Sequence, residues 1–158
     1  MAGGISCSLS SSVVAFVDGP LVVAGAAVKQ FTGAVYKAYV NIAEAETAFE
    51  YARQRGYTTT SPQRGLLLPV DQIPKSALQQ DGTIDAARLT PCATDEEWYV
   101  VYKGVNPGLY PTYLECALNT CGVRLAVHQA YNTLADALVS FRAALRRPGE
   151  VQECRVPK

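Results

Sequence analysis

The chain repeats part of its own sequence 92 residues further along. Residues 34–49 read AVYKAYVNIAEAETAF and residues 126–141 read AVHQAYNTLADALVSF, with seven positions identical. Each segment opens with an alternating stretch typical of a strand. After a polar turn at Asn41 or at Asn132-Thr133, it continues as an Ala-rich helix. The repeat predicts that the chain carries the same strand–turn–helix unit twice.

Upstream of this segment the two copies match less well. Phe16-Val17-Asp18-Gly19 aligns with Val101-Tyr102-Lys103-Gly104, but at a spacing of 85 residues instead of 92. The first copy is therefore shorter, and the residues it lacks correspond to Val105–Pro111. We expect the first copy to be degenerate, without the tip and the return strand of a hairpin.

Composition limits the size and class of the protein. The 158 residues carry 14 basic and 14 acidic side chains, for a formal net charge of zero. Such a length favours one domain or two small lobes. The balanced charge argues against a protein that depends mainly on phosphate contacts, because those carry a surplus of Lys and Arg.

Targeting features are absent from the sequence pattern. The apolar run Val13–Val17 is too short for a signal sequence or a membrane span. The number of cysteines is five, which is odd, and no two of them form a CxxC pair. This usage indicates reduced thiols and not a set of disulfides. We expect a cytoplasmic protein with no membrane partner.

The segment between the copies, Gly56–Glu97, carries four prolines and no long periodic stretch. Its apolar residues Leu66–Val70 predict a structured arm that packs along a lobe or across a partner chain. The resulting prediction for domain organisation is a first lobe at 1–56, an arm at 57–97, a second lobe at 98–147 and a tail at 148–158.

The second copy carries a recognisable pattern: the aromatic strand Trp98–Gly104, the turn Asn106–Tyr110 and the helix start Thr112–Cys116. It resembles the N-terminal hybrid-binding domain of eukaryotic type 1 ribonuclease H, also called the viroplasmin-like domain. The resemblance covers Trp98–Leu145 and, as a degenerate copy, Val13–Ala52. It implies an α+β fold of two β-β-α-β-α lobes, each with three antiparallel strands and two helices on one face.

The local sequence agrees with this resemblance. Pro107-Gly108 supplies a tight turn, and Thr112 with Glu115 forms a capping box at a helix start. The family's catalytic domain is missing. A first lobe without its return strand would expose a sheet edge, so we expect an intertwined homodimer.

The resemblance also implies contact positions. In the family, a strand Tyr, a helix-opening Trp and a Phe-Lys-Lys strand grip RNA–DNA hybrids. The Tyr is kept as Tyr99, the Trp is replaced by Tyr113, and Phe-Lys-Lys becomes His128-Gln129-Ala130, which removes both cations. The first copy keeps Tyr36-Lys37 at the equivalent place. Loss of the cationic side chains that contact phosphate lowers the affinity for nucleic acid.

We therefore predict a non-catalytic carrier that sequesters a small planar aromatic ligand such as a pigment chromophore, similar in role to mushroom chromoproteins. Tyrosine rings offer flat apolar faces and one hydroxyl each, although a half-buried sheet would also explain them. The predicted ligand-binding residues are Tyr99, Tyr113, His128, Tyr36, Lys37, Tyr102 and Tyr110. His128 is also a candidate metal ligand, if the ligand, a second subunit or a carboxylate supplies the remaining donors.

The alternative is a nucleic-acid binding module that recognises RNA–DNA hybrid or double-stranded RNA through Tyr99, Tyr113 and Lys37. Neither hypothesis is enzymatic. With His128 as the only histidine, no nucleophile–base pair is visible, and no phosphate-binding loop occurs.

Overall fold

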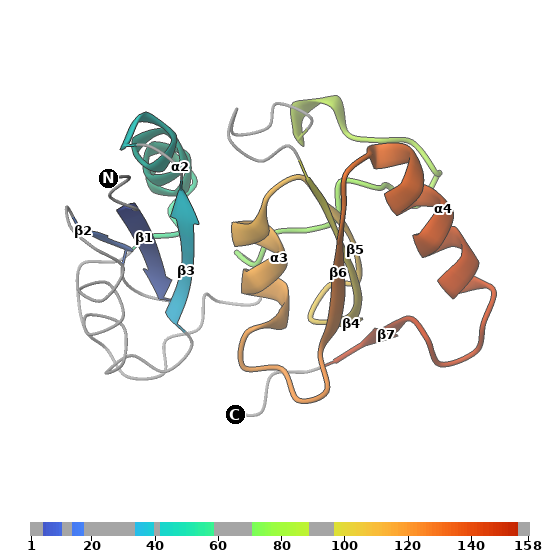
Figure 1. Ribbon diagram of the computed structural model, residues 1–158. Helices are drawn as coiled ribbons and strands as arrows, with labels where there is room; N and C mark the ends of the chain where they lie inside the picture. Colours follow the sequence, from blue (N-terminus) through green and yellow to red (C-terminus); the bar gives the residue numbers. More distant parts are fainter. Residues whose placement is uncertain are drawn as a thin grey trace. The chain divides into compact units, whose positions relative to one another are not determined.

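The computed structural model describes residues 5–10, 14–17, 34–39, 42–58, 71–88 and 97–154. The chain divides into two compact units, Met1–Gln72 and Ile73–Lys158. Each unit holds its own antiparallel sheet and helical cover (Figure 1). The predicted α+β class is confirmed. No helix in the described ranges is long and apolar enough to cross a membrane.

The first unit contains strands β1 (Ile5–Ser10), β2 (Val14–Val17) and β3 (Ala34–Tyr39), followed by helix α2 (Ile42–Gln54). β1 lies at the centre of the sheet, in the order β2-β1-β3. The buried face of α2 is formed by small residues, namely Ala45, Ala48 and Ala52. α2 packs against β1 and β3.

The prediction that the first copy lacks a hairpin strand is wrong. β1 and β2 form an antiparallel hairpin in which Cys7 lies opposite Phe16. Phe16 thus belongs to the second strand of the unit, so its alignment with Val101 of β4 does not hold. The sequence pattern that indicates β1 is the alternation of Ile5, Cys7 and Leu9 with small residues. The expectation of a homodimer rested on the missing strand and loses that support.

The second unit contains strands β4 (Trp98–Gly104) and β5 (Gly108–Tyr110), helix α3 (Tyr113–Thr120), strand β6 (Val127–Tyr131), helix α4 (Leu134–Leu145) and the short strand β7 (Gln152–Glu153). β4 is central in the order β5-β4-β6, and β7 pairs parallel with its end. The strand and the helix predicted for each copy of the repeat are present, as β3 with α2 and as β6 with α4.

The two helices of the second unit lie on opposite faces of its sheet (Figure 1). On one face Tyr99 and Val101 pack with Cys116 of α3. On the other face Val100 packs with Phe141 of α4. The expectation of two helices on one face is wrong, because alternate residues of β4 are apolar on both sides and each side needs its own cover.

Threonine side chains cap the N-termini of both helices of this unit. Thr112 Oγ1 accepts a hydrogen bond from the backbone N–H of Glu115, at 3.2 Å. Thr133 Oγ1 accepts from the backbone N–H of Asp136, at 3.1 Å. These bonds satisfy N–H groups that the helix itself cannot pair. The predicted helix starts are confirmed.

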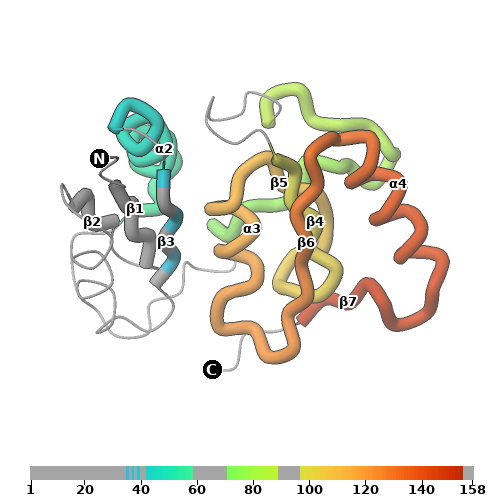
Figure 2. The backbone as a smooth tube through the Cα atoms, in the orientation of Figure 1, coloured from blue at the N-terminus to red at the C-terminus, as the bar shows by residue number. Residues whose placement is uncertain are grey.

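Residues 73–88 of the predicted arm belong to the second unit and pack on its sheet (Figure 2). The Ala77 N–H donates to the carbonyl oxygen of Leu109 at 2.8 Å, and Ser76 Oγ accepts from the Leu109 N–H at 2.9 Å. Gly108 has a φ of +152°, and a Cβ there would overlap the side chain of Ser76. The arm therefore covers the outer edge of β5. Leu66–Val70 lie outside the described residues, and the limits 57 and 97 remain a prediction.

An ion pair joins the end of this arm to helix α3. Arg88 Nη2 lies 3.1 Å from Glu115 Oε1, and the Glu115 side chain is fully buried. Arg88 also donates to the carbonyl oxygen of Lys75. Asn119, buried on the same helix, donates to the carbonyl oxygen of Pro74 at 2.8 Å. These contacts fix α3 against the arm.

Candidate nucleic-acid interface

The first helix of the second unit places an aromatic ring beside the central strand. Tyr113 is the first residue of α3, and its ring meets that of Tyr99 edge-on, with centroids 5.6 Å apart and planes inclined by 62°. Tyr99 is buried, and its hydroxyl donates to Glu97 Oε2 at 2.8 Å. Tyr113 is only half-buried. The exposed part of the pair is therefore Tyr113, with Tyr99 as its support.

Strand β6 adds two exposed residues to the same face. The register of β4 and β6 places His128 opposite Val101 and Ala130 opposite Tyr99. Directly opposed residues of an antiparallel pair point to the same face. His128 and Ala130 are both exposed. Tyr99, Tyr113 and His128, predicted from different parts of the sequence, thus share the α3 face of the sheet.

Two other predicted tyrosines have different surroundings. Tyr110 is fully buried, and its hydroxyl donates to the carbonyl oxygen of Asn106 at 2.5 Å. Tyr102 packs on the α4 face, where its hydroxyl lies 2.7 Å from that of Tyr131 and 2.6 Å from Ser140 Oγ. Burial raises the pKa of Tyr102 to about 12. Tyr110 belongs to the core, and Tyr102 faces away from the surface of Tyr113.

The remaining predicted residues lie in the first unit. Lys37 is half-buried on β3, with Nζ 5.7 Å from the centroid of the Tyr39 ring. This distance suits a cation–π contact. The Tyr36 backbone pairs with Ser8, and the Tyr36 side chain lies outside the described residues. Each of the two units is compact by itself, and Lys37 belongs to a different unit from Tyr113.

Among the described residues, the His, Cys, Asp and Glu side chains form no metal-binding group, and two cysteine thiols are buried. In the described ranges, no group of three or more His, Cys, Asp and Glu side chains is placed to hold a metal ion. Cys116, Cys121 and Cys154 are free thiols. Burial raises the pKa of Cys116 to about 12 and also raises that of Cys121. These two thiols are therefore protonated at neutral pH, which disfavours nucleophilic or metal-binding roles.

Sequence reasoning missed the side chains that hold α3 in place, namely Arg88 and Asn119. One signal could have indicated a partner for this helix. Glu115 sits in the apolar run Tyr-Leu-Glu-Cys-Ala-Leu, and a carboxylate buried in such a run needs a cation or hydrogen-bond donors nearby. The identity of that cation, 27 residues upstream in the chain, is set by tertiary packing alone.

Comparison with known proteins supports one part of this architecture. No curated protein and no solved structure matches the chain. Residues 97–139, which run from the start of β4 into α4 and include Tyr99, Tyr113 and His128, match the family model of the Ribonuclease H1 N-terminal domain.

Proposed function

We propose that the second unit is a non-catalytic module that binds nucleic-acid duplexes, RNA–DNA hybrid foremost, through the α3 face of its sheet. The family that matches residues 97–139 is a hybrid-binding module. The observation that carries the proposal is that Tyr99, Tyr113 and His128 lie on one face of the sheet within the matched segment.

The exposed side chains on this face suit the shallow minor groove of an A-form-like duplex. That groove displays 2′-hydroxyls, which act as donors and acceptors. The half-buried ring of Tyr113 offers an apolar face to a sugar or base edge, and its hydroxyl can bond to a 2′-OH. His128 offers ring nitrogens from the neighbouring strand. Such contacts favour duplexes that contain RNA over duplex DNA.

The charge of the interface predicts modest affinity. On this face Ala130 stands where the family carries a lysine, so the sequence-independent attraction to phosphate is small. Glu97, exposed beside Tyr99, adds a carboxylate that repels phosphate. Binding should therefore depend on shape and hydrogen bonds more than on ion pairs, with a shallow dependence on salt.

The carrier hypothesis receives less support. It counts Tyr102 and Tyr110 among the ligand-binding residues, whereas Tyr110 is in the core and Tyr102 lies on the opposite face of the sheet from Tyr113. The family match favours the nucleic-acid alternative. Visible absorbance of the purified protein would restore the carrier hypothesis.

We further propose that the first unit is a diverged copy of the same domain. Its antiparallel sheet has the order β2-β1-β3, and the second unit has the order β5-β4-β6. In both, a hairpin supplies the central strand and one edge, and the third strand leads into a helix. The third strands and their helices are also the segments that repeat 92 residues apart.

The direct test of the proposed function is fluorescence anisotropy with the 158-residue chain. Labelled RNA–DNA hybrid, double-stranded RNA and duplex DNA of one sequence are titrated at low salt. Hybrid should bind more tightly than duplex DNA, and Tyr113→Ala and His128→Ala should weaken it. Val139→Ala, which truncates an exposed side chain on α4, is the control and should bind like the parent. Site variants that bind hybrid as the parent does would overturn the proposed interface.

A further inference from the structure

A β-bulge interrupts the pairing of β4 with β6. Val101 lies opposite His128, but Lys103 lies opposite Val127, so β4 advances two residues where β6 advances one. Tyr102 is the extra residue. In a regular strand, neighbouring residues point to opposite faces, and Lys103 would lie on the α3 side. The bulge instead brings Tyr102 and Lys103 to one groove on the α4 side.

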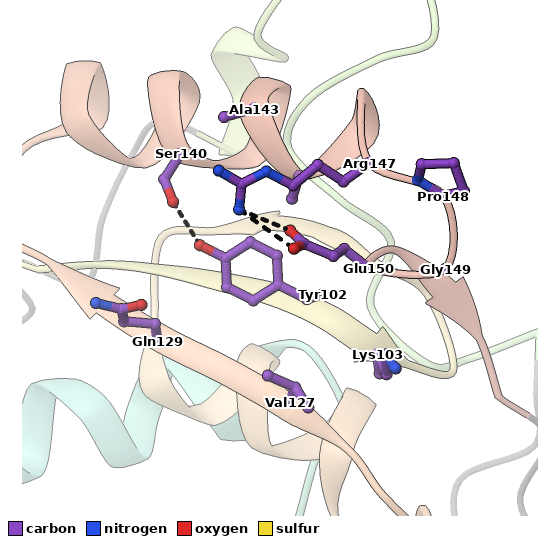
Figure 3. Close-up of a pocket in the computed structure, with 11 residues that line it drawn as sticks. Tyr102, Lys103, Val127, Gln129, Ser140, Ala143, Arg147, Pro148, Gly149 and Glu150 are labelled. Carbon is purple, nitrogen blue, oxygen red and sulfur yellow. Dashed lines mark hydrogen bonds and ion pairs between the residues drawn. The ribbon is translucent and has the colours of Figure 1, made fainter.

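This groove lies between the sheet and the C-terminal half of α4, with a volume of about 530 Å³ (Figure 3). Its sheet side is made by the two residues at the bulge and by β6. Its other side is made by the last turns of α4 and the turn that follows. The lining residues used below are Tyr102, Lys103, Val127, Ser140, Arg147 and Glu150.

The groove combines two cations and one carboxylate, that of Glu150, with a floor that includes Tyr102 and Val127. Lys103 comes from the sheet side and Arg147 from the turn that follows α4. Arg147 Nη1 lies 3.2 Å from Glu150 Oε1, but both side chains are well exposed. An exposed pair of this kind is worth less than about 1 kcal/mol, so Arg147 can turn to another anion at little cost.

The floor offers apolar surface and hydroxyl groups. Val127 is 46% exposed and presents apolar surface to the groove. The hydroxyl of Tyr102 and Ser140 Oγ lie 2.6 Å apart within the groove wall. An apolar body could rest on Val127 and the Tyr102 ring while an anionic head reaches the cations at the rim.

We propose that this groove binds a small organic anion, with an apolar body over Tyr102 and Val127 and a phosphate or carboxylate head between Lys103 and Arg147. The site lies on the opposite face of the sheet from Tyr113. It is independent of the proposed nucleic-acid interface, and either proposal can fail without the other.

The test is an NMR titration of the ¹⁵N-labelled 158-residue chain with phenyl phosphate, benzoate and benzyl alcohol. The two anions should shift amide signals of groove residues, and the neutral alcohol should bind more weakly. Lys103→Gln and Arg147→Gln should each weaken anion binding about tenfold, as expected for loss of a charged hydrogen bond. Lys103→Arg should retain it.

Arg142→Gln is the matched control, since Arg142 is exposed on α4 but does not line the groove. It should bind the anions like the parent. Anion binding that survives in the Lys103→Gln, Arg147→Gln double variant would overturn the proposal, as would equal binding of benzyl alcohol. Displacement of phenyl phosphate by RNA–DNA hybrid would also overturn it, because the groove would then be part of the nucleic-acid surface.

Discussion

The ring of Tyr113 stands edge-on against the ring of Tyr99, with centroids 5.6 Å apart. This contact ties the first residue of α3 to the central strand of the sheet. Tyr99 is itself held through its hydroxyl by Glu97. A ring fixed in this way loses little further freedom when a ligand binds, so more of its contact energy contributes to affinity.

Tyr113→Ala should weaken binding of RNA–DNA hybrid by at least about fivefold, because an aromatic contact to a nucleotide is worth about 1–3 kcal/mol. Tyr113→Phe should retain most of the affinity if the ring carries the contact. Anisotropy titrations measure both. A Phe variant as weak as the Ala variant would assign the contact to the hydroxyl instead.

Ala130→Lys should strengthen hybrid binding and steepen its dependence on salt. Ala130 is exposed on the α3 face, opposite Tyr99, so a lysine there can reach phosphate. One added phosphate contact should change the slope of log affinity against log salt by about 0.9. Ala135→Lys adds the same charge at an exposed position on α4 and should leave the slope nearly unchanged. Equal effects of the two variants would show that only net charge matters.

Gly108→Ala should destabilise the second unit through the arm. The new methyl group would overlap Ser76, whereas Gly82 has a comparably unusual φ of +85° and nothing within 4 Å of its would-be Cβ. Gly108→Ala should therefore lower the free energy of unfolding by about 1–3 kcal/mol more than Gly82→Ala does. Urea denaturation measures the difference. Equal losses would mean that the arm does not pack against β5.

Cys116 should resist alkylation at pH 8, where its pKa of about 12 leaves almost no thiolate. Cys154 is only half-buried and should react before Cys116. Because the raised pKa favours the neutral thiol, Cys116 should stay protected as pH rises from 7 to 9. Peptide mapping after iodoacetamide treatment gives the order. Rapid labelling of Cys116 at pH 8 would contradict its burial.

The features that the sequence predicts well are those set by neighbouring residues. Thr112 and Thr133 cap helices because their side chains reach backbone N–H groups three residues ahead. The turn predicted at Pro107-Gly108 is confirmed only in part, since Pro107 lies in the connection between β4 and β5 but Gly108 is already the first residue of β5. The repeat locates a strand and a helix in each unit because it preserves their apolar periodicity.

The features that the sequence analysis missed depend on distant partners or on weak patterns. β1 alternates Ile5, Cys7 and Leu9 with residues too small to mark a strand strongly. The bulge at Tyr102 is invisible in the sequence, since it is a property of the pairing with β6. It decides which face receives Lys103, one of the two cations of the groove.

The measurement that tests the account most directly is the affinity of the 158-residue chain for RNA–DNA hybrid and for duplex DNA of the same sequence, across a series of salt concentrations. We expect saturable binding of the hybrid with a dissociation constant above about 1 µM at physiological salt, because the interface contacts few phosphates. The affinity for the hybrid should exceed that for duplex DNA, and Tyr113→Ala should lower it. No saturable hybrid binding at low salt, or equal affinity for both duplexes, would contradict the account.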